Sequence, residues 1–215
     1  MERMNTDINS VNHGNMDQKA KEMRQKALEM NTNLAKAYEI MQKLHADNNW
    51  KGNRYNIVSA AFNKQVDCLN SILISTVTDI PFAIEVAANN YSSADGTGRP
   101  HDEIKKPINS IKKIETNEED EVTYIPDVVH QAQETINEYI NQAKKDLEEI
   151  IRLYDEVNWK TEGASITFKN SLNDSREKID EALNEVIVTI NEQVNNLDRS
   201  LEETDKTGST DATNK

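Results

Sequence analysis

Two short polar stretches decide the fold of this chain. The chain has two tryptophans, and each stretch contains one of them. The stretches read Asp47-Asn48-Asn49-Trp50-Lys51-Gly52 and Glu156-Val157-Asn158-Trp159-Lys160-Thr161-Glu162-Gly163. A long run of residues lies on each side of both stretches, with apolar positions three and four apart, which is the spacing of an amphipathic helix. The sequence therefore predicts a helix–turn–helix hairpin written twice.

The first predicted hairpin joins a helix over residues 16–45 to one that begins after the Trp50 turn. The first helix repeats Met23, Ala27, Met30, Leu34, Ala37, Met41 and Leu44. The second repeats Tyr55, Val58, Phe62, Val66, Leu69, Leu73, Val77, Ile80, Ile84 and Ala87. Such seams suit lengthwise packing on a partner helix. Pro81 should kink or restart the second helix, with Asp79 as the cap of the restarted segment.

The second predicted hairpin repeats the pattern with a third and a fourth helix. The third begins near Asp127, the expected N-cap, and repeats Val129, Ala132, Ile136, Tyr139, Ala143, Leu147, Ile150, Tyr154 and Val157. The fourth repeats Ala164, Phe168, Leu172, Ser175, Ile179, Ala182, Val186, Ile190, Leu197 and Leu201. We expect Phe168 and Leu172 to be buried at the seam, and the seam to shift between Ile190 and Leu197.

These patterns divide the chain into five regions: a disordered start (1–15), the first hairpin (16–95), an acidic linker (96–126), the second hairpin (127–206) and a disordered tail (207–215). The spacing of Ile104, Ile108 and Ile111 predicts a short helix in the linker. One hairpin alone leaves an apolar stripe uncovered on each helix. We therefore predict an all-α fold in which two antiparallel hairpins in tandem form a four-helix bundle, or coiled-coil-like rod. Pairing within one chain and pairing in a homodimer both stay open.

Charge and composition exclude several classes of partner. The formal net charge is −13, and residues 1–91 carry ten basic and ten acidic side chains, so the whole acidic excess lies in the remainder. A nucleic-acid partner would require a basic face. Cys68 is the only cysteine, so no internal disulfide forms. The start of the chain lacks an apolar signal segment. No window approaches ~18–20 consecutive apolar residues, so we expect no stable membrane insertion.

Catalytic and metal-binding patterns are missing from the sequence. The four histidines, His13, His45, His101 and His130, lack metal-ligand spacing, and no Glu-x-x-His motif occurs. There is no phosphate-binding loop, nucleophile elbow or zinc-protease helix. We expect no enzymatic activity, no cofactor and no metal ion.

One further motif, Tyr91-Ser92-Ser93-Ala94-Asp95, stands near the end of the first hairpin. Tyr91 and Asp95 are four apart, so on a helical turn they present a ring and a carboxylate on one face. Together with Trp50-Lys51-Gly52 in the turn and Phe62 beyond it, residues 16–95 resemble the Trp-x-Gly (WXG) family, the early-secreted-antigen-like hairpins of bacterial type VII secretion. Residues 127–204 resemble a degenerate copy, with Trp159, Gly163 and Phe168, but Thr161 stands where the motif expects glycine.

The resemblance implies a non-enzymatic substrate or partner of a type VII secretion system. Such a protein is secreted without a cleaved signal peptide, after a cytoplasmic stage, with Tyr91 and Asp95 as its export motif. Its partners would be the secretion ATPase or other WXG-type proteins. In the family, one hairpin supplies the tyrosine motif and the other sets its Trp-x-Gly turn beside it.

Other interpretations stay open at this stage. Trp50 and Trp159 can act as amphipathic staples at half-buried corners, and Tyr91 can be an ordinary boundary aromatic. As a whole, the protein can instead be a cytoplasmic helical adaptor or targeting chaperone that escorts a type VII toxin. A membrane-active helical toxin is disfavoured because no long apolar hairpin is available to insert.

Overall fold

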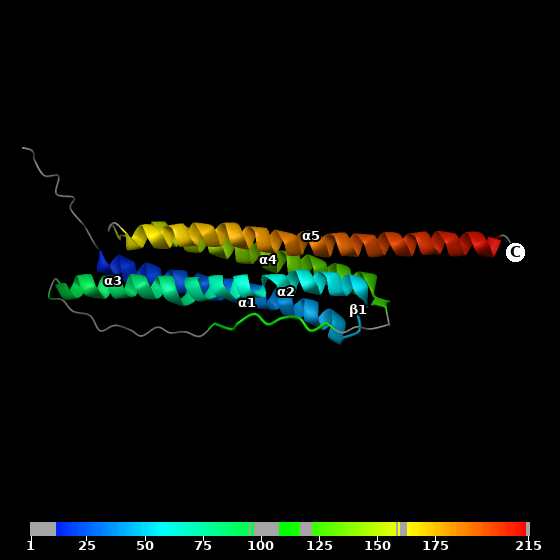
Figure 1. Ribbon diagram of the computed structural model, residues 1–215, viewed down its shortest axis with the longest axis horizontal. Helices are drawn as coiled ribbons and strands as arrows, with labels where there is room; N and C mark the ends of the chain where they lie inside the picture. Colours follow the sequence, from blue (N-terminus) through cyan, green and yellow to red (C-terminus); the bar gives the residue numbers. More distant parts are fainter. Residues whose placement is uncertain are drawn as a thin grey trace, which may run out of the picture. The chain divides into compact units, whose positions relative to one another are not determined.

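Long helices dominate the computed structural model, which describes residues 12–94, 96, 108–116, 122–157, 159 and 163–213. They are α1 (His13–Ala46), α2 (Asn53–Ile74), α3 (Ile80–Ala94), α4 (Pro126–Asp155) and α5 (Ala164–Thr213), and the π-helical turn η1 (Ser75–Asp79) joins α2 to α3 (Figure 1). Two-residue strands, β1 (Trp50–Lys51) and β2 (Thr123–Tyr124), pair antiparallel. The described chain is mostly helical, so the predicted all-α class is confirmed.

The chain folds into two compact units, and both hairpins contribute to each. Unit 1 consists of Met1–Thr32, Asn70–Asn109 and Ala143–Lys178, and unit 2 of Asn33–Leu69, Ser110–Gln142 and Ile179–Lys215. In unit 1, Lys19 Nζ lies 2.7 Å from Glu156 Oε2, which joins α1 to the end of the second hairpin's first helix. In unit 2, Lys64 Nζ of α2 lies 2.7 Å from Glu185 Oε1 of α5. The two hairpins therefore contact each other within one chain.

The seams predicted from the sequence form most of the core. Met23, Met30 and Met41 of α1 are fully buried, as their spacing indicated, and so is Met16, seven residues before Met23. On α5 the buried positions run from Leu172 through Ile190 and then to Val194, whereas Leu201 is 45% exposed. The seam thus continues through Val194 and ends there. Phe168 is only half-buried, so its expected place in the core is wrong.

Pro81 does not break its helix, because the helix widens just before it. Over η1 the backbone adopts π-helical bonding, and the amide of Ile80 donates to the carbonyl of Ser75, five residues earlier. Pro81 has no N–H for the carbonyl of Val77, four residues earlier. Arg24 of α1 supplies that donor, with Nε 3.1 Å from the Val77 oxygen. Where the sequence predicted a kink or restart, the structure has the π-helical turn η1, after which an α-helix resumes at Ile80.

The guanidinium of Arg24 is also ion-paired inside unit 1. Its Nη1 atom lies 3.2 Å from Oε1 of Glu85, and the two side chains are 4% and 6% exposed. Glu85 is one turn beyond Pro81, so a single arginine satisfies both the orphan carbonyl and a buried carboxylate. Removing one member of a buried pair leaves the other charge without compensation, which is costly.

Residues 108–116 of the linker are not helical, so the short helix predicted there is wrong for this stretch. Ile104 lies outside the described residues. Two asparagine side chains bind its backbone instead. In unit 1, Asn31 donates to the carbonyl of Asn109 and accepts from its amide. In unit 2, Asn63 makes the same two bonds with Ile114. Ile111 and Ile114 are buried. The asparagine side chains thus hold the linker backbone, and the linker in turn places two isoleucine side chains in the core.

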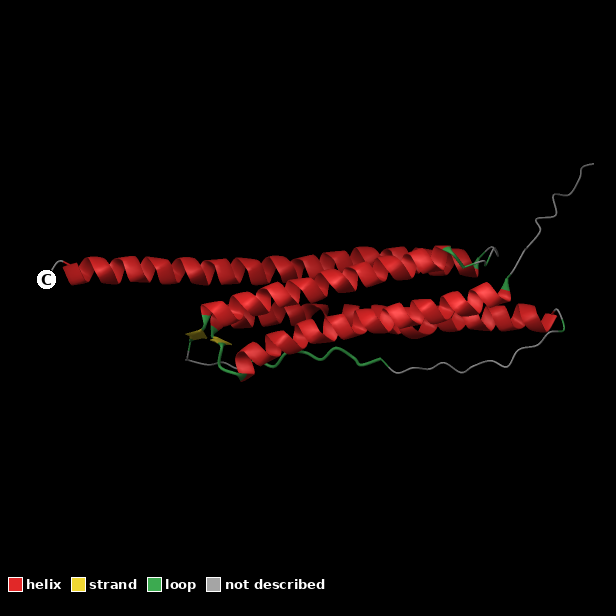
Figure 2. Ribbon diagram, turned by 180° about the vertical axis from the view of Figure 1, so that it is seen from behind, coloured by secondary structure: helices red, strands yellow, loops and turns green. Residues whose placement is uncertain are grey.

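Three predicted helix ends differ from those observed. Helix α1 begins at His13, so residues 13–15 are helical where a disordered start was predicted. Helix α4 begins at Pro126, with the amide of Val129 donating to the carbonyl of Ile125, so Asp127 lies in the first turn and is not the N-cap. Proline suits this first position because it needs no amide partner. Helix α5 continues to Thr213, beyond the predicted boundary at 206 (Figure 2).

The run Asn53–Ala94 is the one described helix that is long and apolar enough to cross a membrane by length and composition. Half of its most apolar window is buried inside the protein. The core helix of a globular domain has the same properties, and Leu69, Leu73 and Val77 are fully buried here.

Candidate functional site

The Trp50 turn, in unit 2, is exposed at Asp47 and Asn48 but buries Trp50. Helix α1 ends in a Schellman motif: Asn48 has a φ of 57°, its amide donates to the carbonyl of His45, and the amide of Asn49 donates to that of Leu44. The chain then forms β1, in which Trp50 pairs with Tyr124 of β2. Returning linker residues therefore cover the turn.

The Trp50 indole is 1% exposed and lies among aromatic rings. Its centroid is 5.9 Å from that of Tyr55 and 6.4 Å from that of Tyr124, both in edge-on geometry. Such contacts add to the apolar burial of the ring. The ring is therefore enclosed, where the sequence suggested a half-buried corner, and it presents almost no surface to a partner in this arrangement.

Beside this turn, Tyr124 belongs to a polar cluster that the sequence did not indicate. Its hydroxyl donates to Oδ1 of Asp198 at 2.8 Å, and His130 Nε2 lies 2.9 Å from Asp198 Oδ2. Burial raises the pKa of Tyr124 above that of a free tyrosine, and the neighbouring Asp198 carboxylate raises it further. The cluster joins β2, α4 and α5 within unit 2 and so secures the strand that covers Trp50.

The glycines of the two turns have the same backbone role. Gly52 and Gly163 have φ values of 102° and 100°, and each immediately precedes the second helix of its hairpin. The carbonyl of Gly52 accepts the amide of Asn56, and that of Gly163 accepts the amide of Thr167. Only glycine adopts this conformation at little cost. The second turn is therefore a version of the first with its glycine two positions later, and Thr161, in the expected glycine position, lies outside the described residues.

The Trp159 turn, in unit 1, has no covering strand among the described residues. Trp159 is half-buried, and its ring centroid is 6.1 Å from that of Phe168, which is also half-buried. Ile166, in the first turn of α5 and two residues before Phe168, is 56% exposed. The Trp159 turn therefore has an aromatic pair at its surface, whereas the tryptophan of the other turn, Trp50, is enclosed.

Tyr91 lies in the last turn of α3, also in unit 1, and is half-buried. The helix ends after Ala94, where Gly96 has a φ of 74° and its amide donates to the carbonyl of Ser93. Asp95 lies outside the described residues. The structure therefore describes Tyr91 but does not test whether the two side chains share a face, as the sequence predicts. Figures 1 and 2 show that α3 ends, α4 ends and α5 begins toward the same end of unit 1.

The structure thus divides the predicted site residues between the two units. Tyr91, Trp159 and Gly163 belong to unit 1, whereas Trp50 and Gly52 belong to unit 2. Within the described part of the chain, no group of three or more His, Cys, Asp or Glu side chains is arranged to hold a metal ion. No protein-family model, curated protein or solved structure matches this chain.

Proposed function

We propose that the protein is a non-enzymatic substrate or partner of a bacterial type VII secretion system, in which two WXG-type hairpins are fused and pair along one four-helix bundle. Its export signal would combine Tyr91 and Asp95, at the end of the first hairpin, with the Trp159 turn of the second. The observation that carries this proposal is that α3 ends, α4 ends and α5 begins toward the same end of unit 1.

The exposure of the aromatic side chains supports this choice of surface. Tyr91 and Trp159 are half-buried and so present part of each ring to solvent, whereas Trp50 is enclosed. Partly exposed tyrosine and tryptophan rings are common anchors in protein interfaces. In the WXG family, a partner's Trp-x-Gly turn lies beside the tyrosine motif. In this chain the Trp159 turn would take that role, because it shares a unit with Tyr91 and the Trp50 turn does not.

The test is export of tagged variants from cells that express a type VII system, with and without its ATPase. We expect ATPase-dependent release of the unaltered chain, and loss of release for Tyr91→Ala, Asp95→Ala and Trp159→Ala. Circular-dichroism melts would check that each variant stays folded. Ile166→Ala is the matched control, since this exposed side chain is near the same turn but outside the proposed signal.

The opposite result would select the other class of function. Normal release of the Tyr91 and Asp95 variants would reject the export signal. An unaltered chain that stays in the cytoplasm, whether or not the ATPase is present, would favour an adaptor or targeting chaperone that escorts a secreted toxin.

The bundle is tested separately. Residues 1–95 and 127–215, produced as two polypeptides, should associate, because each unit contains contacts between the hairpins. If the two polypeptides do not bind each other, the intramolecular bundle is wrong even if export is normal.

A further inference from the structure

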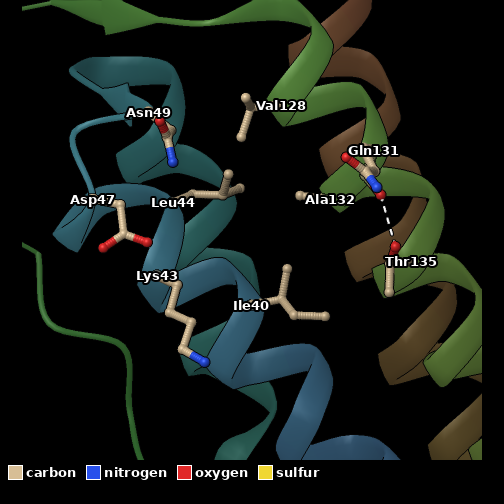
Figure 3. A pocket seen from close by; sticks show the side chains of 9 residues that line it. All are labelled: Ile40, Lys43, Leu44, Asp47, Asn49, Val128, Gln131, Ala132 and Thr135. Atoms are coloured by element: carbon tan, nitrogen blue, oxygen red, sulfur yellow. Dashed lines mark hydrogen bonds between the residues drawn. The ribbon is translucent and has the colours of Figure 1, made fainter.

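An open groove of about 270 Å³ lies in unit 2 between the last turns of α1 and the first turns of α4 (Figure 3). Its walls are apolar: Ile40 and Leu44 of α1 point toward Val128 and Ala132 of α4. Polar side chains, among them Lys43 and Asp47, line its edge. None of the residues assigned above to the export signal contributes to this groove.

Apolar side chains at the groove and just before it in the chain are exposed. Val128, which lines the groove, is 38% exposed, and Ile125, three residues earlier, is 42% exposed. The backbone of the segment before α4 is held by the β1–β2 pair and by the bond from the Ile125 amide to the carbonyl of Asn49, which lines the groove. Clustered apolar side chains that remain in water next to a groove are typical of an interaction surface.

The size of the groove indicates what kind of molecule it fits. Small-molecule pockets usually enclose ~300–1,000 Å³ and bury most of the ligand. This groove is smaller and open along one side, so it accommodates one or two projecting side chains and does not enclose a free ligand. A groove with apolar walls between two helices suits an amphipathic helix, which places side chains of one face between them.

The charged side chains at the edge of the groove determine which amphipathic helices it favours. Lys43 is already paired with Glu39, with Nζ and Oε1 2.7 Å apart. Asp47 is exposed at the edge, and the exposed Asp127 and Glu134 directly precede the lining residues Val128 and Thr135. The edge is therefore acidic and favours a basic partner. A second copy of this chain, with a formal net charge of −13, would be repelled.

We propose that the α1–α4 groove docks a basic amphipathic helix of a partner protein. Leucine-like side chains of the partner would insert between Leu44 and Val128, and its flanking lysines or arginines would face Asp47 and its acidic neighbours. This surface is separate from the proposed export signal and does not depend on it.

The experiment measures binding of a labelled synthetic helix by fluorescence anisotropy, with the full chain. The probe carries leucines on one face and lysines beside them, and its control carries glutamates in place of the lysines. We expect saturable binding of the lysine peptide, weakened by added salt, and at least about tenfold weaker binding of the glutamate peptide, a difference of about 1.4 kcal/mol.

Variants locate the site. Val128→Lys and Ala132→Phe should each weaken binding about tenfold or more, the first by charge and the second by filling the groove. Val188→Lys is the matched control, because Val188 is 52% exposed on α5 and lies outside the groove. Absence of saturable binding, equal binding of the two peptides, or an equal loss in Val188→Lys would overturn the proposal. Export of Val128→Lys should be normal, so failure here is distinct from failure of the export signal.

Discussion

The Trp50 turn and the Trp159 turn start from the same backbone design and reach different ends. Each places a tryptophan before a glycine with a φ near 100°, and that glycine starts the returning helix. Yet Trp50 is 1% exposed beneath β2, whereas Trp159 is half-buried against Phe168. The difference teaches that a turn motif defines the path of the chain, and distant residues decide whether its aromatic ring is core or surface.

The two units also differ in where a buried polar anchor lies. In unit 2 the turn itself is secured, because Tyr124 pairs with Trp50 and is hydrogen-bonded to Asp198. In unit 1 a buried anchor lies at Pro81, where Arg24 bonds to Val77 and pairs with Glu85. The Trp159 turn can therefore be altered with less effect on folding than the Trp50 turn.

The largest expected effect is that of removing the enclosed indole. Trp50→Ala should lower the free energy of unfolding by about 3–5 kcal/mol, because it leaves a cavity among Tyr55 and Tyr124. Trp159→Ala should cost about 1 kcal/mol, since its ring is half in water already. Urea unfolding followed by far-ultraviolet circular dichroism measures both. Equal costs would show that the two turns are not different in the way described.

The second effect probes the anchor of unit 1. Arg24→Met leaves Glu85 charged and uncompensated in the interior, and should cost about 3–5 kcal/mol in urea unfolding. Adding Pro81→Ala restores an amide for the Val77 carbonyl, so the double variant should recover part of the loss, with a coupling energy of about 0.5–3 kcal/mol.

A surface ion pair provides the control for Arg24. Lys43 and Glu39 of α1 lie 2.7 Å apart with side chains 63% and 60% exposed, and Lys43→Met should leave the free energy of unfolding almost unchanged. Strict additivity of Arg24→Met and Pro81→Ala would mean that the arginine does not compensate for the proline.

A smaller effect tests the shared glycine geometry. Gly52→Ala and Gly163→Ala should each cost about 1–3 kcal/mol, because both place a side chain at positive φ. The Gly52 variant also brings a Cβ to 3.2 Å from Val122 Cγ2, whereas nothing lies within 4 Å of the corresponding position at Gly163. Val122 is exposed and can rotate, so the extra cost should be only a few tenths of a kcal/mol.

Thermal or urea melts of Gly52→Ala with and without Val122→Ala would separate contact from strain. If Gly163→Ala leaves the free energy of unfolding unchanged, Gly163 does not act as the counterpart of Gly52.

The smallest effect concerns alkaline pH. Burial raises the pKa of Tyr38 and Tyr55 in unit 2 and of Tyr154 in unit 1 above the ordinary tyrosine value. A raised pKa means that the folded state holds the proton more tightly. The stability from these groups is therefore complete below the ordinary pKa of about 10 and is lost as the pH rises above it.

Tyr38→Phe removes one such group, along with the 2.6 Å bond from its hydroxyl to the carbonyl of Phe62. Its free energy of unfolding should fall less steeply above about pH 10 than that of the unaltered chain. Urea midpoints across that pH range measure the slope, and an unchanged slope would exclude Tyr38 as a contributor.

Much of the fold could be predicted from local patterns. The apolar spacing identified the four helical runs, and most of the core residues of α1 followed from it, including its three seam methionines. The same reasoning failed at Phe168, because periodicity assigns a face of a helix but cannot show where the neighbouring helices stop covering it.

The candidate site was less predictable. Tyr91 and both tryptophans were visible in the sequence, but which tryptophan shares a unit with Tyr91 depends on how the hairpins pack. Arg24 had an indirect signal: a proline within a helix leaves a carbonyl that needs a donor. Nothing local identified the donor, since the two partners are 53 positions apart in the chain.

By itself the sequence determined the helices, the two turns and the glycines that start the returning helices, because helical periodicity and positive φ are properties of neighbouring residues. Tertiary structure alone decided that Trp50 is core and Trp159 is surface. The strand that covers Trp50 comes from the end of the linker, more than 70 positions later in the chain. Its pairing with β1 replaces water as the partner of backbone groups at the turn. Such long-range pairing depends on the path of the whole chain, so no short motif encodes it.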